Sequence, residues 1–466
     1  MNRKILPMAI TAATMSVAGL SNAEINMNGF ATVGTGLVLT EGKSYGGYDE
    51  KLRFDSGSNV GLQFSSDMGD GLNATAQFIA RGSDNWSVEA EWAYISYEVT
   101  DSIKVIAGKQ RSPFYMYSDY VDVGYAYHWV TPPDGVYSLP FDSTNALALV
   151  SNNYFGDLDS TFQVLVGRNN QEINFNGPSK MDSYNTFTVN WTGVYEFATF
   201  RLGYSKGKLD IGIDALNDLT TPWEDIEGTV RDYTYAGAYK EVYEQTYAPT
   251  YAGNYAAQIT AGADEANAVL AAETAATAAA TAGAEATATA YATAAAAAVA
   301  DIDGQKISDG IKIDEDDVTF AGVGVTLDFD TYFFVAELTR LDLGDSLVGL
   351  NTSSYIGAGY RMNDFTFHAT YGMDEDKTSS TLFDDIDPNL LDKDHASYVP
   401  ALAGLTDAAK ATLEAGNAKS HYITVGTRWD FHPSSALKLD MTQYVNDLAE
   451  EDAETSLFRL ALTTVF

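Results

Sequence analysis

The chain has 466 residues, no cysteine and a formal charge of −37, with 64 acidic residues against 27 lysines and arginines. Without cysteine it cannot carry a disulfide framework, a thiolate metal site or a cysteine nucleophile. The acidic excess argues against nucleic acid as a partner, because phosphate binding needs clustered basic side chains. High tyrosine, phenylalanine and glycine contents with few prolines favour one large β-structure over several helical domains.

The first 23 residues have the pattern of a secretory signal peptide. Basic residues at positions 3 and 4 precede an apolar run over residues 5–20, and small residues occupy Ser21 and Ala23. An apolar run of this length, flanked in this way, is typical of a cleaved signal and not of a membrane anchor. We therefore expect cleavage after Ala23 and a mature exported domain over residues 24–466.

Segments with alternating apolar and polar residues follow, each about ten residues long, which is the length that a tilted strand needs to cross a bilayer. In residues 365–371 every second residue is aromatic or alanine, and the residues between them are polar. All ten prolines after the signal lie outside the predicted strands, as expected if no strand has an unpaired edge. The sixteen predicted strands begin near residues 24, 55, 71, 87, 102, 144, 159, 182, 198, 318, 331, 353, 364, 420, 435 and 456.

The connections between these strands alternate between tight turns and long loops. The longest loops are predicted at residues 110–143, 207–317 and 374–419. Short turns at one end and long loops at the other are typical of outer-membrane barrels, whereas a soluble sandwich has no reason to separate them. The sequence therefore predicts an all-β fold, a transmembrane antiparallel β-barrel of about sixteen strands with short periplasmic turns and long extracellular loops.

Two loop segments have helical character. Alanine makes up 25 of the 45 residues in 256–300, and because alanine is the best helix former we expect one or two helices there, with disorder as the alternative. A shorter helix is predicted over residues 407–415, with Thr406 as its N-cap and Gly416 as its stop.

Three short motifs resemble the Gram-negative general porins. Residues 93–97 (Ala-Tyr-Ile-Ser-Tyr) and 107–113 (Ala-Gly-Lys-Gln-Arg-Ser-Pro) are similar to the family's fourth and fifth strands, and residues 28–30 (Asn-Gly-Phe) to its first strand. The chain departs from the family pattern at Thr464, at Glu91 and in the alanine-rich insert. The residues that resemble the family's C-terminal assembly signal are Phe458, Leu460, Leu462 and Phe466.

In that family a similar glycine-basic run opens a loop that folds into the pore, which implies a constriction loop over residues 110–143. Its acids would face basic residues of luminal parity across a narrow aqueous gap and set up a transverse field. Alternatively, the acids cap turns and the aromatic residues pack the loop against the wall. The expected loop acids are Asp119, Asp122, Asp134 and Asp142, and the other loop candidates are Arg111, Tyr115, Tyr117, Tyr120 and Trp129. The expected basic wall is Lys104, Arg201, Arg361, Arg428, Lys438 and Arg459.

Motifs that suggest other chemistry lack the required context. Residues 203–207 match the G-x-S-x-G nucleophile pattern, but no helical period follows them, as a nucleophile elbow would require. The five histidines contain no i, i+4 pair for zinc. We therefore assign no catalytic residue, metal site or cofactor.

The leading hypothesis is a passive outer-membrane porin for small hydrophilic solutes and ions, with a cation preference created by its acidic loops. The resemblance also implies a homotrimer, contact with lipid and lipopolysaccharide, and insertion by the barrel-assembly machinery. One alternative is an oligosaccharide channel in which loop aromatics stack on sugars. A remote alternative is an outer-membrane barrel enzyme.

Overall fold

A computed structural model describes residues 24–137, 139, 143–174, 178–344, 346, 349–378, 381–449, 451 and 453–466. The predicted signal peptide lies outside these residues.

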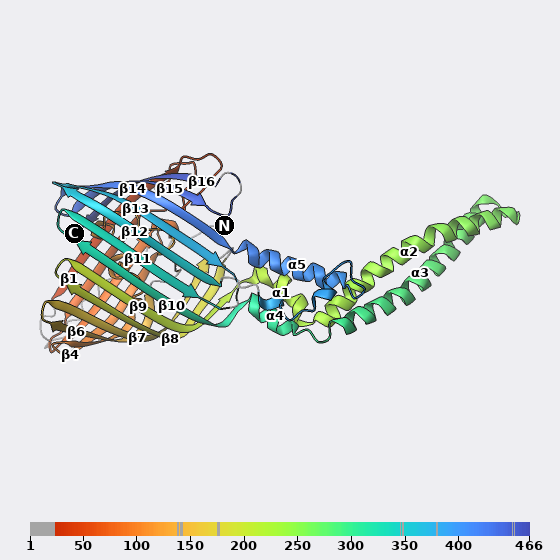
Figure 1. Cartoon of the computed structure of the whole chain (residues 1–466), viewed down its shortest axis with the longest axis horizontal. Coiled ribbons are helices and arrows are strands. Elements are labelled where there is room, and N and C mark those ends of the chain that lie inside the picture. Colours follow the sequence, from red (N-terminus) through yellow and green to blue (C-terminus); the bar gives the residue numbers. More distant parts are fainter. Residues whose placement is uncertain are drawn as a thin grey trace, which may run out of the picture.

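The described residues form sixteen strands that close into one antiparallel barrel, in which β1 pairs with β16 (Figure 1). The predicted fold class is confirmed, and every predicted strand start lies within five residues of the observed one. The strands are β1 (Ile25–Val38), β2 (Asn59–Asp67), β3 (Leu72–Arg81), β4 (Val88–Thr100), β5 (Ile103–Arg111), β6 (Ser143–Phe155), β7 (Leu158–Asn174), β8 (Pro178–Tyr195), β9 (Ala198–Gly212), β10 (Ile313–Asp328), β11 (Tyr332–Asp342), β12 (Leu350–Met362), β13 (Phe365–Lys377), β14 (Ala418–His432), β15 (Ser435–Asn446) and β16 (Glu454–Val465).

Alternation along each strand separates an apolar outer face from a polar inner face. On β13, Phe367 is 43% exposed on the outside, whereas its neighbours Thr366 and His368 are buried inside the barrel. Such a period of two is what a wall between lipid and an aqueous interior requires.

Seven tight turns lie at one end of the barrel. The seven connections there, from β2–β3 to β14–β15, have two to four residues each, and the C-terminus lies at the same end (Figure 1). The opposite end carries the long loops, together with some shorter connections. Strands extend further than predicted, so the longest loops span residues 112–142, 213–312 and 378–417 instead of 110–143, 207–317 and 374–419.

The barrel closes where the two ends of the chain meet. Gly29 N donates to Phe466 O at 2.7 Å, and Phe466 N donates to Gly29 O at 2.9 Å. The Phe466 ring occupies the space that a Cβ on residue 29 would need, which explains the glycine. Phe458, Leu460 and Leu462 lie on the outer face of β16, opposite the buried side chains on its inner face.

Two long loops fold together into a helical domain at the loop end, which we call the crown (residues 213–312 and 381–417). The first loop supplies α1 (Asn217–Glu224), α2 (Ile226–Thr260), α3 (Glu265–Ala298) and α4 (Gly304–Ile311), and the second supplies α5 (Pro400–Ala415). Their shared apolar core includes Trp223 and Ile311 from the first loop and Leu402 from the second, each fully buried. Lys306 donates to Asp385 at 2.7 Å, which lowers the pKa of that carboxyl and adds a second link between the loops.

Helices α2 and α3 form an antiparallel hairpin that projects from the barrel (Figure 1). With 35 residues, α2 is about 52 Å long. The predicted helical character of residues 256–300 is correct, but α2 begins 30 residues earlier, at Ile226. Among the described residues, none of the helices combines the length and the apolar character needed to cross a bilayer. Helix α3 buries an alanine at every fourth position, and these small side chains let the two helices come close together. The buried alanines are Ala268, Ala272, Ala276, Ala280, Ala284, Ala288 and Ala292.

The helix predicted over residues 407–415 is longer than expected. Helix α5 starts at Pro400 and not after Thr406, because proline is well tolerated in the first turn, where its missing N–H costs nothing. Thr406 is instead a buried interior residue, and Gly416 is the C-cap as predicted.

Because the crown has its own core, it should unfold separately from the barrel. Trp223→Ala should cost the crown about 3–5 kcal/mol and reduce helical far-UV circular dichroism, while the unheated protein still migrates as a folded barrel on gels. The matched control is Leu270→Ala, since Leu270 is 62% exposed on α3. Simultaneous loss of helix and barrel in Trp223→Ala would contradict independent folding.

Candidate functional site

The loop between β5 and β6 (residues 112–142, the luminal loop) folds into the barrel, where residues 112–137 and 139 are described. It contains the short helices η2 (Ser118–Tyr120) and η3 (Gly124–Ala126). The loop crosses the lumen and contacts strands on the opposite side of the barrel. Trp129 Nε1 donates to Thr370 on β13 at 2.9 Å, and Val130 N donates to Asp440 on β15 at 2.8 Å.

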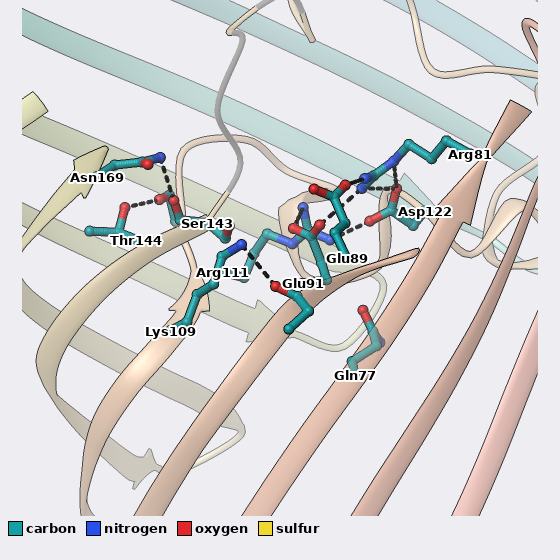
Figure 2. Close-up of polar contacts among 12 residues, drawn as sticks. Gln77, Arg81, Glu89, Glu91, Lys109, Arg111, Asp122, Ser143, Thr144 and Asn169 are labelled. Carbon is teal, nitrogen blue, oxygen red and sulfur yellow. Dashed lines mark hydrogen bonds and ion pairs between the residues drawn. The ribbon is translucent and has the colours of Figure 1, made fainter. Parts of the chain in front are cut away.

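An ion cluster anchors the loop near its base (Figure 2). Arg111 Nη2 lies 2.5 Å from Asp122, and Arg111 Nη1 lies 3.4 Å from Glu91. Arg81 also reaches both carboxylates, at 2.9 Å from Asp122 and 3.2 Å from Glu91. The side chains of Arg111 and Glu91 are only 5% and 3% exposed. Two guanidinium groups and two carboxylates therefore neutralise one another away from bulk water.

Glu91 takes its place in this cluster through an irregularity in β4. The register with β3 changes from Gln77–Trp92 to Phe78–Ala90, so Glu91 is an extra residue, a β-bulge. A bulge re-aims a side chain, and strict alternation along β4 would have placed this carboxylate on the opposite face. At Glu91, where the chain departs from the porin pattern, the carboxylate pairs with Arg81 and Arg111.

The other described loop acids also contact basic wall residues. Asp119 lies 3.2 Å from Arg201 on β9, and Asp134 lies 3.5 Å from Arg459 on β16. The expectation that these charges face one another across an aqueous gap is therefore wrong for these pairs, because the loop is docked against the wall. Asp142 lies outside the described residues.

Arg428 and Lys438 bind loop backbone and not loop acids. Arg428 donates to Tyr125 O at 2.7 Å and Tyr127 O at 2.9 Å. Lys438, which is fully buried, donates to Trp129 O at 2.7 Å and also to Gly124 O. Cations that hold carbonyl groups in this way fix the path of the loop without cancelling its carboxylates.

The last two predicted wall residues lie apart from the loop acids. Arg361 pairs with Asp328 at 2.6 Å and stacks over Phe333, with 4.8 Å between the guanidinium carbon and the ring centroid. Lys104 stands opposite Glu98 in the β4–β5 ladder, close to a tight turn. Four of the six predicted basic residues therefore contact the loop directly.

A second buried cluster, on the side of the barrel opposite the ion cluster, was not predicted as a site. His368 Nε2 lies 3.2 Å from Asp440, both side chains being fully buried, and the His128 ring of the loop lies 4.8 Å from the His368 ring. Alternation had placed His368 on the luminal face, but its partners come from a loop and from a strand 72 residues away, which no local pattern reveals.

The aromatic residues of the loop pack against one another and against the wall. Tyr115, Tyr117 and Trp129 are buried, and the Tyr117 and Trp129 rings meet edge to face at 5.5 Å. Glu337 on β11 supports this cluster by accepting hydrogen bonds from Met116 N at 2.7 Å and Tyr137 Oη at 2.7 Å. Of the predicted rings only Tyr120 is exposed, so most of the aromatic surface in the described part of the loop is used in packing.

A polar chamber of 570 Å³ remains between the loop and the short-turn end of the barrel. Three ion pairs line it, in which Arg201 meets Asp119, Arg361 meets Asp328 and Arg428 meets Asp430. Because these charges alternate around the chamber, it suits water, ions and polar solutes better than apolar ones.

Comparisons with known proteins support the architecture. No protein-family model matches the sequence, and no curated protein sequence matches it either. OmpF of Salmonella typhi aligns with a TM-score of 0.50 and 10% identity over 95% of this chain and 98% of that chain. The outer membrane channel DcaP of Acinetobacter baumannii aligns at 0.48 with 11% identity (96% and 99% covered), and OmpT of Vibrio cholerae at 0.47 with 10% (95% and 99%). At 10% identity the OmpF likeness shows the fold, which is that of an outer-membrane barrel.

In the ion cluster, we expect the buried partner of Arg81 to contribute more to stability than its exposed partner. Glu91→Gln leaves buried guanidinium charge uncompensated and should lower the free energy of unfolding by about 3 kcal/mol or more. Glu89→Gln removes a partner that is 51% exposed and should cost less than about 1 kcal/mol. Urea unfolding in lipid vesicles, followed by tryptophan fluorescence, measures both. Equal losses would show that the burial of Glu91 is unimportant.

Proposed function

We propose that the chain is an outer-membrane porin that lets small hydrophilic solutes and ions diffuse passively through its barrel. The observation that carries this proposal is the luminal loop, which narrows the lumen while a chamber lined by ion pairs stays open beneath it. An apolar outer face and a polar inner face give such a barrel the surfaces that a membrane channel needs.

In this proposal the luminal loop acts as the constriction. Its three described acids pair with the wall and leave a field that is local, since each of these charges is compensated within 3.5 Å. Solute selection then depends mainly on the width left beside the loop and on the polarity of the chamber.

The constriction should disappear when the loop is shortened. A flexible Gly-Ser linker in place of residues 117–135 removes most of the loop. The Tyr115 and Tyr137 rings, which lie 4.7 Å apart, can still hold its two ends together. Single-channel recording in planar bilayers should show a several-fold larger unitary conductance for this variant. Deletion of residues 250–280 at the hairpin tip is the control and should leave the conductance unchanged. A loop variant that conducts like the parent would show that the loop does not limit flow.

We also propose a preference for cations. The chain carries −37, and residues 374–418 alone contain ten acids against three bases, so cations concentrate at the loop end. Under a KCl gradient, the zero-current potential should have the sign of a cation-selective channel. The preference should weaken at 1 M salt, where the Debye length falls to about 3 Å. Anion selectivity at low salt would refute the proposal.

We also propose how the protein is exported, inserted into the outer membrane and assembled. Residues 1–23 would direct export with cleavage after Ala23, and the barrel-assembly machinery would recognise the C-terminal Phe466 with Phe458, Leu460 and Leu462. The inserted barrel would contact outer-membrane lipid and lipopolysaccharide, and a homotrimer is proposed from the porin resemblance alone. Amino-terminal sequencing and native mass measurement in detergent test the cleavage site and the trimer separately.

A further inference from the structure

We propose that a groove in the crown binds uncharged oligosaccharides. This goes beyond channel function and concerns a different part of the molecule. The groove has a volume of 1240 Å³ and is lined by residues of α2, of α3 and of the segment 396–405 at the start of α5. Figure 1 shows α5 beside the base of the α2–α3 hairpin. Sites for drug-sized ligands occupy about 300–1,000 Å³, so this groove has room for a chain of several sugar units.

Three tyrosines supply aromatic surface to the groove. Tyr233 on α2 is 61% exposed, Tyr291 on α3 is 59% exposed, and Tyr398 precedes α5 and is half-buried. Elsewhere on α2, rings from Tyr235 to Tyr255 stack on one another at intervals of four residues. None of the three groove rings stacks on another ring within the described chain, so no aromatic neighbour covers their faces. Such rings offer an apolar face for the C–H side of a sugar and a hydroxyl at the rim.

Polar groups in the groove are positioned for hydroxyl ligands. Gln245 Nε2 donates to Glu241 Oε1 at 3.0 Å, which orients both side chains along α2 and leaves further acceptor oxygens free. Thr234, Thr287 and Ser397 add hydroxyl side chains to the lining of the groove.

Charge selects among possible ligands. Among the twenty described residues that line the groove, only Glu241 is charged. An anionic chain would find no base there and would meet the overall charge of −37. A polycation would find a single carboxylate. Uncharged sugars match a lining of phenols, hydroxyls, one amide and small apolar side chains.

Isothermal titration calorimetry tests the proposal on the full-length protein in a detergent without a sugar headgroup. The probes are maltohexaose, cellohexaose and isomaltohexaose, and we expect saturable binding of at least one. Tyr233→Ala and Tyr291→Ala should each weaken that binding about fivefold to tenfold. Tyr233→Phe should retain it, because the ring face remains. Tyr247→Ala, within the stacked row outside the groove, is the matched control and should bind like the parent.

Several results would overturn the proposal. These are the absence of saturable binding by all three hexasaccharides, equal binding by the parent and by both alanine variants, or tighter binding of a chitosan or heparin hexasaccharide. Loss of self-association in both alanine variants would also overturn it, because it would show that a second copy fills the groove. Far-UV circular dichroism confirms that each variant keeps its helices. The groove variants should conduct like the parent in bilayers, so a failure of channel activity bears on the proposed function and not on the groove.

Discussion

Every backbone N–H and C=O group that faces hydrocarbon must find a partner within the protein, because no water is present to bond it. A sheet satisfies this only by closing, and the pairing of β1 with β16 from Phe30–Val465 to Val38–Leu457 completes the ring. The closure brings the first strand of the barrel against the last residues of the chain. A hydrogen-bonded ring of this kind is rigid. Differences in function must therefore come from the loops, which the barrel holds in place but which are not part of its sheet.

The luminal loop is positioned by charge. Desolvating ions is expensive, and a buried pair is weak evidence for added stability. These contacts instead make the placement of the loop specific. An alternative loop path would take Asp122 away from Arg81 and Arg111. It would also leave Lys438 buried without the loop carbonyl groups that it binds. The base of the loop is held by the ion cluster and its far side by Lys438 and Asp440, so the segment between them has little freedom. A narrow lumen with a defined shape follows from this arrangement.

The crown shows how a barrel can support a second body without adding a strand. Two loops that leave the same end of the ring are brought together by the wall, and their apolar residues then share one core. The hairpin depends on the small size of alanine, because close contact between α2 and α3 replaces the bulk of a normal core. Its base, where the helices diverge toward α5, leaves the groove that we propose as a sugar site.

The sequence by itself determined the strands of the barrel wall and which face of each strand points inward. Whether a strand residue faces lipid or lumen depends on its own parity, so sixteen strands and the inward direction of Arg201, Arg428, Lys438 and Arg459 could be derived locally. Only the tertiary structure decided which residues and loops contact one another inside and above the barrel. The bulge that re-aims Glu91, the link between His368 and Asp440, and the union of loops 213–312 and 378–417 all join residues that are distant in the chain or depend on an altered register. The burial of the loop aromatics is of the same kind. A period of two is a property of neighbouring residues, whereas a contact across a barrel exists only after the barrel has closed.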